Sequence, residues 1–428
     1  MLPRNLTHNR QREVLGLFLR SLLISCAACV CMSAEAQWQQ RATSPYSGGW
    51  DAAGFAIGNK VYVGTGWCCG AIPGSYQEDF RAYDVISNSW STIAPFGGGI
   101  RGGAAAFSVA GKGYVFGGSN GTDQKDLWEY STSSDTWVQR ADMPTSFGRR
   151  EAVAFSIGSV AYVGLGVYAQ GIPSITMTLS DLWAYDPASN SWTQRAPLPS
   201  AGRGMAVAFV IETDAYVATG YGYSSTVPQE MWKYNSVANS WEQVASLPAE
   251  LSRSEAVGFS INGFGYVSLG RQSGAALSDL WRYRPATDSW QQQTSFPGSP
   301  REAAVACSIG NKAYICHGGN LAGTVSYHDM WSYEPQQDPL NGIDEYEMRR
   351  LSIAPNPNDG HLTIKFARET DPRQLELLDA SGRVVLSKLM SATRSSIDID
   401  LSDWERGLYL MQVTFVDGNQ AVERIIKD

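Results

Sequence analysis

The chain has 428 residues, a formal net charge of −8, 43 glycines, 14 tryptophans and seven cysteines. This length exceeds what one compact domain usually holds, so we expect more than one domain. The acidic balance and the lack of a basic run argue against nucleic acid as a partner. The four cysteines beyond residue 36 (Cys68, Cys69, Cys307 and Cys316) are too scattered for a disulfide framework, and their oxidation state stays open.

Residues 1–36 are predicted to be a secretory signal peptide. Arginines make the leader basic, the run "SLLISCAACVCMSA" is uncharged, and "AEA" precedes Gln37. The uncharged run is too short to form a transmembrane helix. The stretch "LISC" also suits a lipoprotein signal with a lipid on Cys26, and this alternative stays open.

A repeat with a period of about 50 residues dominates the sequence from residue 37 to residue 340. The first half of each unit contains a tyrosine, with an aromatic residue or cysteine seven positions before it and a glycine four positions after it. The six tyrosines are Tyr62, Tyr114, Tyr162, Tyr216, Tyr266 and Tyr314. The glycines are Gly66, Gly118, Gly166, Gly220, Gly270 and Gly318.

The second half of each unit is equally regular. An acidic residue opens a phrase such as "DLWEY" or "DMWSY", and in five units a tryptophan follows the tyrosine of this phrase by seven positions. These tryptophans are Trp90, Trp137, Trp192, Trp241 and Trp290, to which we assign a structural role. The sixth unit has Leu340 at this position. We expect the acids to cap nearby loops, because aspartate readily accepts hydrogen bonds from backbone N–H groups.

Each unit divides into four short strands, here called a to d, that end at glycines and polar turns. The pattern resembles kelch repeats, which implies an all-β six-bladed propeller over residues 37–340. The glycine doublet typical of the family is in register only at Gly117–Gly118, so the spacing carries the resemblance. Trp38 stands in "WQQRATSP", a fourth-strand phrase without the three strands before it, so we expect it to complete blade six. A shared blade would seal the exposed edges of the ring.

Residues 341–350 are expected to be a linker, and residues 351–428 a small Ig-like β-sandwich. The phrases "PNP", "DASGR", "GLY" and the terminal "IIKD" resemble type A C-terminal sorting domains of the type IX secretion system of the Bacteroidetes. The resemblance implies passage across the outer membrane by that machinery, with the protein either released or kept at the surface. The alternative is an accessory Ig-like domain.

The b–c and d–a connections should share one face of the ring, and the b–c connections vary most in length, which marks this face for binding. An arginine precedes strand a in five units, and we expect these side chains to ring the channel mouth: Arg101, Arg149, Arg203, Arg253 and Arg301. Guanidinium groups suit carboxylates or sugars there, but the series could equally form an Arg–acid lattice between blades. Trp50, Glu151, Glu255 and His317 complete the ligand-binding candidates. Cys316–His317 with His328–Asp329 offers ligand types that could hold a metal, but we expect no metal site and a structural role for the His317 side chain.

These features favour a secreted or cell-surface binding or adhesion module for a glycan or protein ligand. We expect a monomer with no catalytic residues, no cofactor and no transmembrane segment. The alternative is a carbohydrate-active enzyme, since six-bladed kelch proteins include sialic acid mutarotases. A copper radical oxidase like galactose oxidase fits poorly, because only His317, His328 and His361 follow the leader.

Overall fold

The computed structural model describes residues 37–46, 49–68, 75–170, 175–222, 229–248, 252–336, 351–354, 360–366, 372–379, 383–390, 396–416 and 420–427. The predicted signal peptide and the linker at 341–350 lie outside these residues, so both, and the domain boundaries that depend on them, stay predictions. Among the described residues, no helix has the length and apolar character needed to cross a membrane.

Six antiparallel four-stranded sheets form the larger unit, which is the predicted six-bladed propeller. Blade one contains β2 (Ala53–Ile57), β3 (Lys60–Gly64), β6 (Phe80–Asp84) and β7 (Ser89–Thr92). Blade two contains β8 (Ala105–Val109), β9 (Lys112–Phe116), β10 (Leu127–Ser131) and β11 (Thr136–Arg140). Blade three contains β12 (Val153–Ile157), β13 (Val160–Gly164), β16 (Leu182–Asp186) and β17 (Ser191–Arg195). Blades four and five run β18 (Val207–Ile211), β19 (Asp214–Ala218), β20 (Met231–Asn235), β21 (Ser240–Val244); and β22 (Val257–Ile261), β23 (Phe264–Ser268), β26 (Leu280–Arg284), β27 (Ser289–Gln293). The innermost strands contact one another in the cyclic order β2, β8, β12, β18, β22, β28 and back to β2, so the ring is closed.

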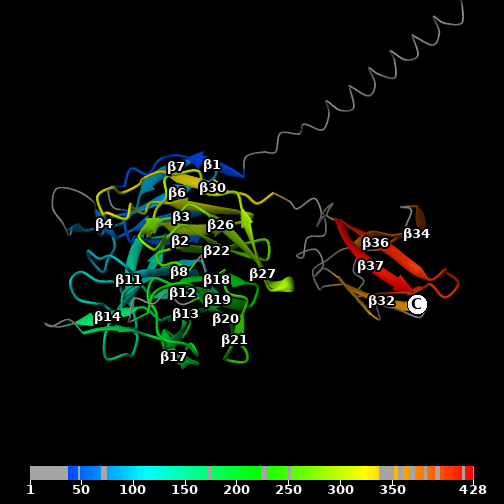
Figure 1. Cartoon of the computed structure of the whole chain (residues 1–428), viewed down its shortest axis with the longest axis horizontal. Helices are drawn as coiled ribbons and strands as arrows, with labels where there is room; N and C mark the ends of the chain where they lie inside the picture. The colour runs from blue at the N-terminus through cyan, green and yellow to red at the C-terminus, as the bar shows by residue number, and fades with distance from the viewer. Residues whose placement is uncertain are drawn as a thin grey trace, which may run out of the picture.

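Blade six combines strands from both ends of this unit. Its sheet runs β28 (Val305–Ile309), β29 (Lys312–Cys316), β30 (Met330–Tyr333) and β1 (Trp38–Arg41), and Trp38 lies opposite Tyr333. In Figure 1 the blue β1 accordingly lies beside the yellow β30. The Trp38 ring is 6% exposed and packs against Phe296 and Tyr333.

The repeated aromatic residues explain why each unit folds as a blade. In five blades the strand a phenylalanine stacks on the strand b tyrosine, with nearly parallel rings whose centroids lie 5.1–5.4 Å apart; Cys307 takes the phenylalanine position in blade six. Burial of such rings on both sides of each sheet is the main source of apolar stabilisation.

The fourth-strand tryptophans join neighbouring blades. Each donates its indole N–H to a backbone oxygen of the preceding blade at 2.7–3.1 Å: Trp38 to Thr294, Trp90 to Ala42, Trp137 to Ala94, Trp192 to Ala141, Trp241 to Ala196 and Trp290 to Ala245. The five alanines also donate their own N–H to an Asn or Asp of the c–d turn that precedes the tryptophan. We call this paired contact the interblade clasp.

The invariant glycine after strand b has a steric reason. Its φ is +85° to +95° in all six blades. A Cβ there would stand 2.5–2.9 Å from the backbone oxygen of the chain entering strand a. The preceding position also has positive φ in every blade, but Thr65, Leu165, Thr219, Leu269 and His317 occupy it as well as Gly117. The second glycine is thus required in all six blades, whereas the first position tolerates a side chain in five. In blade two a Cβ on Gly117 would stand 2.6 Å from the Arg149 backbone oxygen, which explains why the doublet is complete there.

The C-terminal residues form two sheets around one core. The first contains β31 (Leu351–Ala354), β32 (His361–Phe366) and β35 (Ser396–Asp400), and the second contains β34 (Val384–Leu389), β33 (Pro372–Leu378), β36 (Gly407–Phe415) and β37 (Gln420–Lys427). Leu362, Ile364, Leu375, Met411 and Ile425 are among the buried residues that they share. The Ig-like character of this unit stays a prediction.

Candidate functional site

The predicted arginine series is buried between the strands and does not line the channel mouth. The five side chains are 0–2% exposed. Each guanidinium lies 2.6–2.7 Å from the acid that opens the next "DLWxY"-type phrase: Arg101 with Asp126, Arg149 with Asp181, Arg203 with Glu230, Arg253 with Asp279 and Arg301 with Asp329. The arginines are therefore held in ion pairs within their own blades, so their placement as ligand-binding groups is corrected. The alternative of a lattice between blades is not what these pairs form, since each joins the start of strand a to the start of strand c of one blade.

The acids of these phrases also need correction, since they bind arginine instead of capping loops. Burial alone would raise the pKa of Asp181, Asp279 and Asp329, but hydrogen bonds from the paired arginine lower it below the ordinary value. In four blades each guanidinium also donates to the backbone oxygen before the invariant glycine. Blade one has no arginine, and there the Tyr46 hydroxyl donates to the equivalent oxygen, that of Thr65.

The residue two positions after the arginine is the one that reaches the channel mouth. Asp51, Gly103, Glu151, Met205, Glu255 and Ala303 have φ between +53° and +65°. The N–H of each residue from Gly103 onward donates to the backbone oxygen of the one before it at 2.8–3.2 Å. We call these six residues the mouth ring. Its acids, Asp51, Glu151 and Glu255, come from blades one, three and five, above a channel lined by alanine, glycine and valine.

The carboxyl groups of the mouth ring have raised pKa values. Burial and the nearby charge of Glu255 raise the pKa of Glu151 to about 7, and burial with the charges of Asp51 and Glu302 raises the pKa of Glu255 to about 8. Burial also raises the pKa of Asp51 well above its ordinary value. Two cations act on this group and oppose the rise in pKa. Arg271 lies 3.0 Å from Glu255 and 3.7 Å from Glu302, and the charge of Arg150 acts on Asp51 and Glu151.

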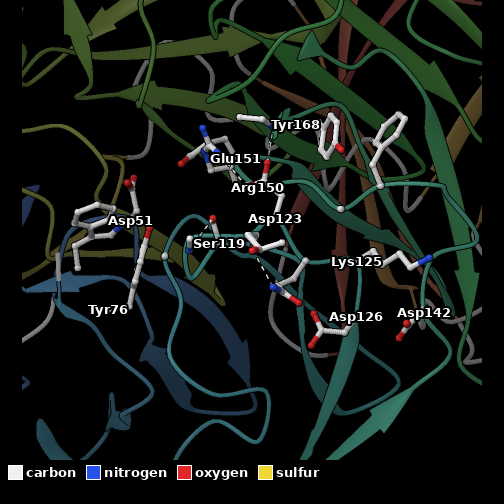
Figure 2. Close-up of a pocket in the computed structure, with 18 of the residues that line it drawn as sticks. Asp51, Tyr76, Ser119, Asp123, Lys125, Asp126, Asp142, Arg150, Glu151 and Tyr168 are labelled. Atoms are coloured by element: carbon white, nitrogen blue, oxygen red, sulfur yellow. Dashed lines mark hydrogen bonds and ion pairs between the residues drawn. The ribbon is translucent and has the colours of Figure 1, made fainter. Parts of the chain in front are cut away.

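A cavity of about 1070 Å³ opens beside the mouth ring on the face of the b–c and d–a connections. Its lining comes from blades one to three and from Met205, which precedes blade four. Figure 2 shows Asp51 and Tyr76 on one side and Tyr168 across from them, with Ser119, Asp123, Arg150 and Glu151 between. Two small hairpins contribute side chains: β4 (Trp67–Cys68) with β5 (Ser75–Tyr76), and β14 (Val167–Gln170) with β15 (Ile175–Thr178).

Two aromatic pairs stand in the cavity lining. Trp67 and Tyr76 pack edge to face with ring centroids 4.6 Å apart. Phe147 and Tyr168 stack, also with centroids 4.6 Å apart. Because the two pairs come from different blades and different connections, their spacing is fixed by the propeller framework and not by one loop.

The polar part of the cavity is built around Asp123. This side chain is buried, accepts a hydrogen bond from Arg150 at 2.7 Å through one oxygen, and accepts the Ala169 N–H at 2.7 Å through the other. Lys125 donates to the backbone oxygen of Thr145 at 2.9 Å. The Ser119 hydroxyl and the Gln124 amide also line the cavity, and the amide is held by its hydrogen bond to the Thr122 oxygen at 2.9 Å. The cavity thus presents carboxylates, a hydroxyl and an amide, as specific ligand sites require.

The remaining candidates lie in different places. Glu151 lines the cavity and the mouth ring, whereas Glu255 lines only the mouth ring. The Trp50 ring covers Gly319 and Gly323 at the junction of blades one and six. His317 is buried beside Tyr46 and His328.

No metal site stands out: within the described ranges, no three His, Cys, Asp or Glu side chains are grouped to hold a metal ion. Cys307 and Cys316 are buried free thiols.

Sequence reasoning missed Trp67, Tyr76, Asp123, Phe147 and Tyr168. One signal was available for Trp67, because it directly follows the invariant glycine, where its backbone bridges to Trp50. The equivalent residues in the other blades are Ser119, Val167, Tyr221, Arg271 and Gly319, so this position varies around the ring as a specific site would.

The comparisons with known proteins agree with this fold. Residues 100–144 match the Kelch motif. A solved structure described as the structure of YjhT aligns with 69% of this chain and 97% of its own, with a TM-score of 0.59 at 17% identity. The protein is thus a kelch-type β-propeller. Residues 352–428 match the secretion system C-terminal sorting domain, so the propeller carries a type IX sorting domain and is exported to the cell surface or secreted.

Curated relatives share part of the propeller. N-acetylneuraminate epimerase of Pasteurella multocida is 31% identical over 194 residues, which cover 36% of this chain and 49% of the relative. The protein of the same name from Haemophilus influenzae is 26% identical over 205 residues, or 39% and 52%. Mouse Kelch-like protein 35 is 32% identical over 120 residues, or 28% and 18%. The chain thus spans about half the length of the epimerases it matches.

Proposed function

We propose that this exported propeller is a glycan-binding module whose ligand occupies the cavity between blades one and three. The observation that carries the proposal is the pairing of aromatic faces with fixed hydroxyl, amide and carboxylate groups in one cavity. A pyranose ring has an apolar face that packs on an aromatic side chain and an edge of hydroxyls that both donate and accept hydrogen bonds. The export by the sorting domain places such a module where glycans are found.

A glycan array probed with the purified protein tests this proposal. We expect binding to a defined set of glycans and its loss in Trp67→Ala and Tyr168→Ala. Phe264→Ala is the matched control, because Phe264 is a partly buried aromatic residue at the start of β23, next to the a–b turn, and does not line the cavity. Silence on the array, with capture of a protein ligand at the same face, would contradict the proposal.

Carbohydrate acid–base catalysis is the second candidate, favoured by Glu151 and Glu255. Opening a sugar hemiacetal requires one group to accept the anomeric hydroxyl proton and another to protonate the ring oxygen as the ring C–O bond breaks. Groups with pKa values of about 7 and 8 supply both forms near neutral pH. Two of the relatives compared above are named as epimerases of a sugar, which points in the same direction.

Nuclear magnetic resonance of anomer interconversion tests the second candidate. N-acetylneuraminate and neutral reducing sugars are followed with the protein and with Glu151→Gln and Glu255→Gln. Acceleration that both variants reduce would support catalysis. Rates equal to those in buffer would end this candidate and leave the binding module unaffected.

A further inference from the structure

The cavity is larger than a single sugar residue requires. Pockets of about 300–1000 Å³ enclose drug-sized ligands, and the volume here is about 1070 Å³. One hexose, with about a dozen non-hydrogen atoms, is less than half of such a ligand. A monosaccharide would therefore leave much of the cavity filled with water.

The two aromatic pairs divide this volume between two walls. Trp67 and Tyr76 belong to blade one, whereas Phe147 precedes blade three and Tyr168 follows its strand b. Figure 2 shows Tyr76 and Tyr168 on opposite sides of the polar residues. A ligand that packs on both walls must extend over the polar residues between them, as consecutive sugar residues do.

The charges of the lining oppose a carboxylate-bearing sugar. Among its described residues are five acids and two bases: Asp51, Asp123, Asp126, Asp142, Glu151, Lys125 and Arg150. Asp123 is paired with Arg150 at 2.7 Å and Asp126 with Arg101 at 2.7 Å. Lys125 donates to the uncharged Thr145 oxygen at 2.9 Å and keeps its charge, which offsets one further acid, Asp142. The arginine series that would suit a carboxylate is buried in its own ion pairs. The two acids that remain, Asp51 and Glu151, have a raised pKa. They repel a ligand carboxylate when they are ionised, so the discrimination against acidic sugars grows as the pH rises.

We infer that the cavity binds a neutral oligosaccharide of at least two residues, held between the Trp67–Tyr76 and Phe147–Tyr168 walls, and that it discriminates against acidic sugars. The inference rests on the proposed glycan-binding function and names its ligand class. It separates this protein from relatives named for N-acetylneuraminate, a sugar acid.

Calorimetric titration with defined sugars tests the inference. The probes are glucose, mannose and N-acetylglucosamine oligomers of one to six residues, together with N-acetylneuraminate and oligogalacturonate. We expect one neutral series to bind, with affinity rising from one residue to two or three and then levelling. Trp67→Ala and Phe147→Ala should each weaken a tetramer about tenfold, and Phe264→Ala should not. Unchanged melting temperatures verify that the variants fold. The variants Trp67→Leu and Phe147→Leu serve as a second control, because leucine keeps an apolar side chain but removes the aromatic ring.

The acidic lining gives a second readout. Asp142→Asn with Glu151→Gln should raise the affinity for oligogalacturonate relative to the neutral tetramer. The inference is overturned if acidic sugars bind more tightly than neutral ones, or if a monosaccharide binds as tightly as its tetramer. Both outcomes leave the glycan-binding function standing, whereas failure of all probes together with a silent array overturns that function as well.

Discussion

Replacing Trp38 by alanine tests the closure of the ring through β1. The change removes a ring that is 6% exposed, its packing on Phe296 and Tyr333, and its 2.9 Å hydrogen bond to the Thr294 oxygen. Truncation of a buried tryptophan costs about 3–5 kcal/mol. A propeller of about 300 residues loses roughly 1.6 °C per kcal/mol at its midpoint, so we expect a decrease of roughly 5–8 °C.

The assay is thermal and urea unfolding followed by near-ultraviolet circular dichroism and tryptophan fluorescence. Deletion of residues 38–41 should have a larger effect, because it also exposes the edge of β30 and removes the pairing of Trp38 with Tyr333. Val237→Ala is the control, since this side chain is 93% exposed and its loss should change stability by under about 0.5 kcal/mol. A deletion variant that unfolds at the same midpoint as the intact protein would refute the reasoning.

Three further predictions concern other parts of the propeller. Arg149→Ala should destabilise the fold by about 3–5 kcal/mol in urea titrations, because it breaks a 2.6 Å ion pair whose arginine is fully buried; a change under about 1 kcal/mol would contradict the structural role. The melting temperature should fall as the pH rises from about 5 to 9, because the native pKa of Glu255, about 8, exceeds its ordinary value of 4.5. The contribution of Glu255 to the stability of the fold is complete below about pH 4.5 and is lost as the pH rises through 8. Glu255→Gln should flatten that decline, and an unchanged slope would exclude this origin. Gly270→Ala should destabilise more than Gly263→Ala, since both have positive φ but only the first places a Cβ 2.5 Å from a backbone oxygen; equal midpoints would contradict the steric argument.

The repeated residues predicted the framework because their roles depend on strand geometry alone. Phe155 and Tyr162 face each other across two antiparallel strands in any such unit, and the spacing of Trp192 carries it to the neighbouring blade. The arginines were placed at the channel mouth, which the residue two positions later reaches. The chain bends there at a positive φ, as at Glu151, and sequence periodicity does not report that bend.

The cavity could be predicted only in its location. Length variation in the b–c connections pointed to the right face, but Tyr76 and Tyr168 come from two-stranded hairpins that no repeated pattern marks. Phe147 lies in a d–a connection and meets Tyr168 across 21 residues of sequence that include two strands. Such contacts depend on how blades sit around the ring, and hence on the tertiary fold.

The shared blade also has a consequence for the order in which the chain folds. Arg41 donates a hydrogen bond to Ser332, which is 291 residues further along the chain. Blades one to five can form from local hairpins as they are synthesised, but the first strand waits without a partner until nearly the whole propeller exists. Closure of the ring therefore requires β30, and a chain that stops before Met330 lacks it. The paired β1 therefore distinguishes a complete propeller from an incomplete one, because only a propeller with all six blades can pair its first strand.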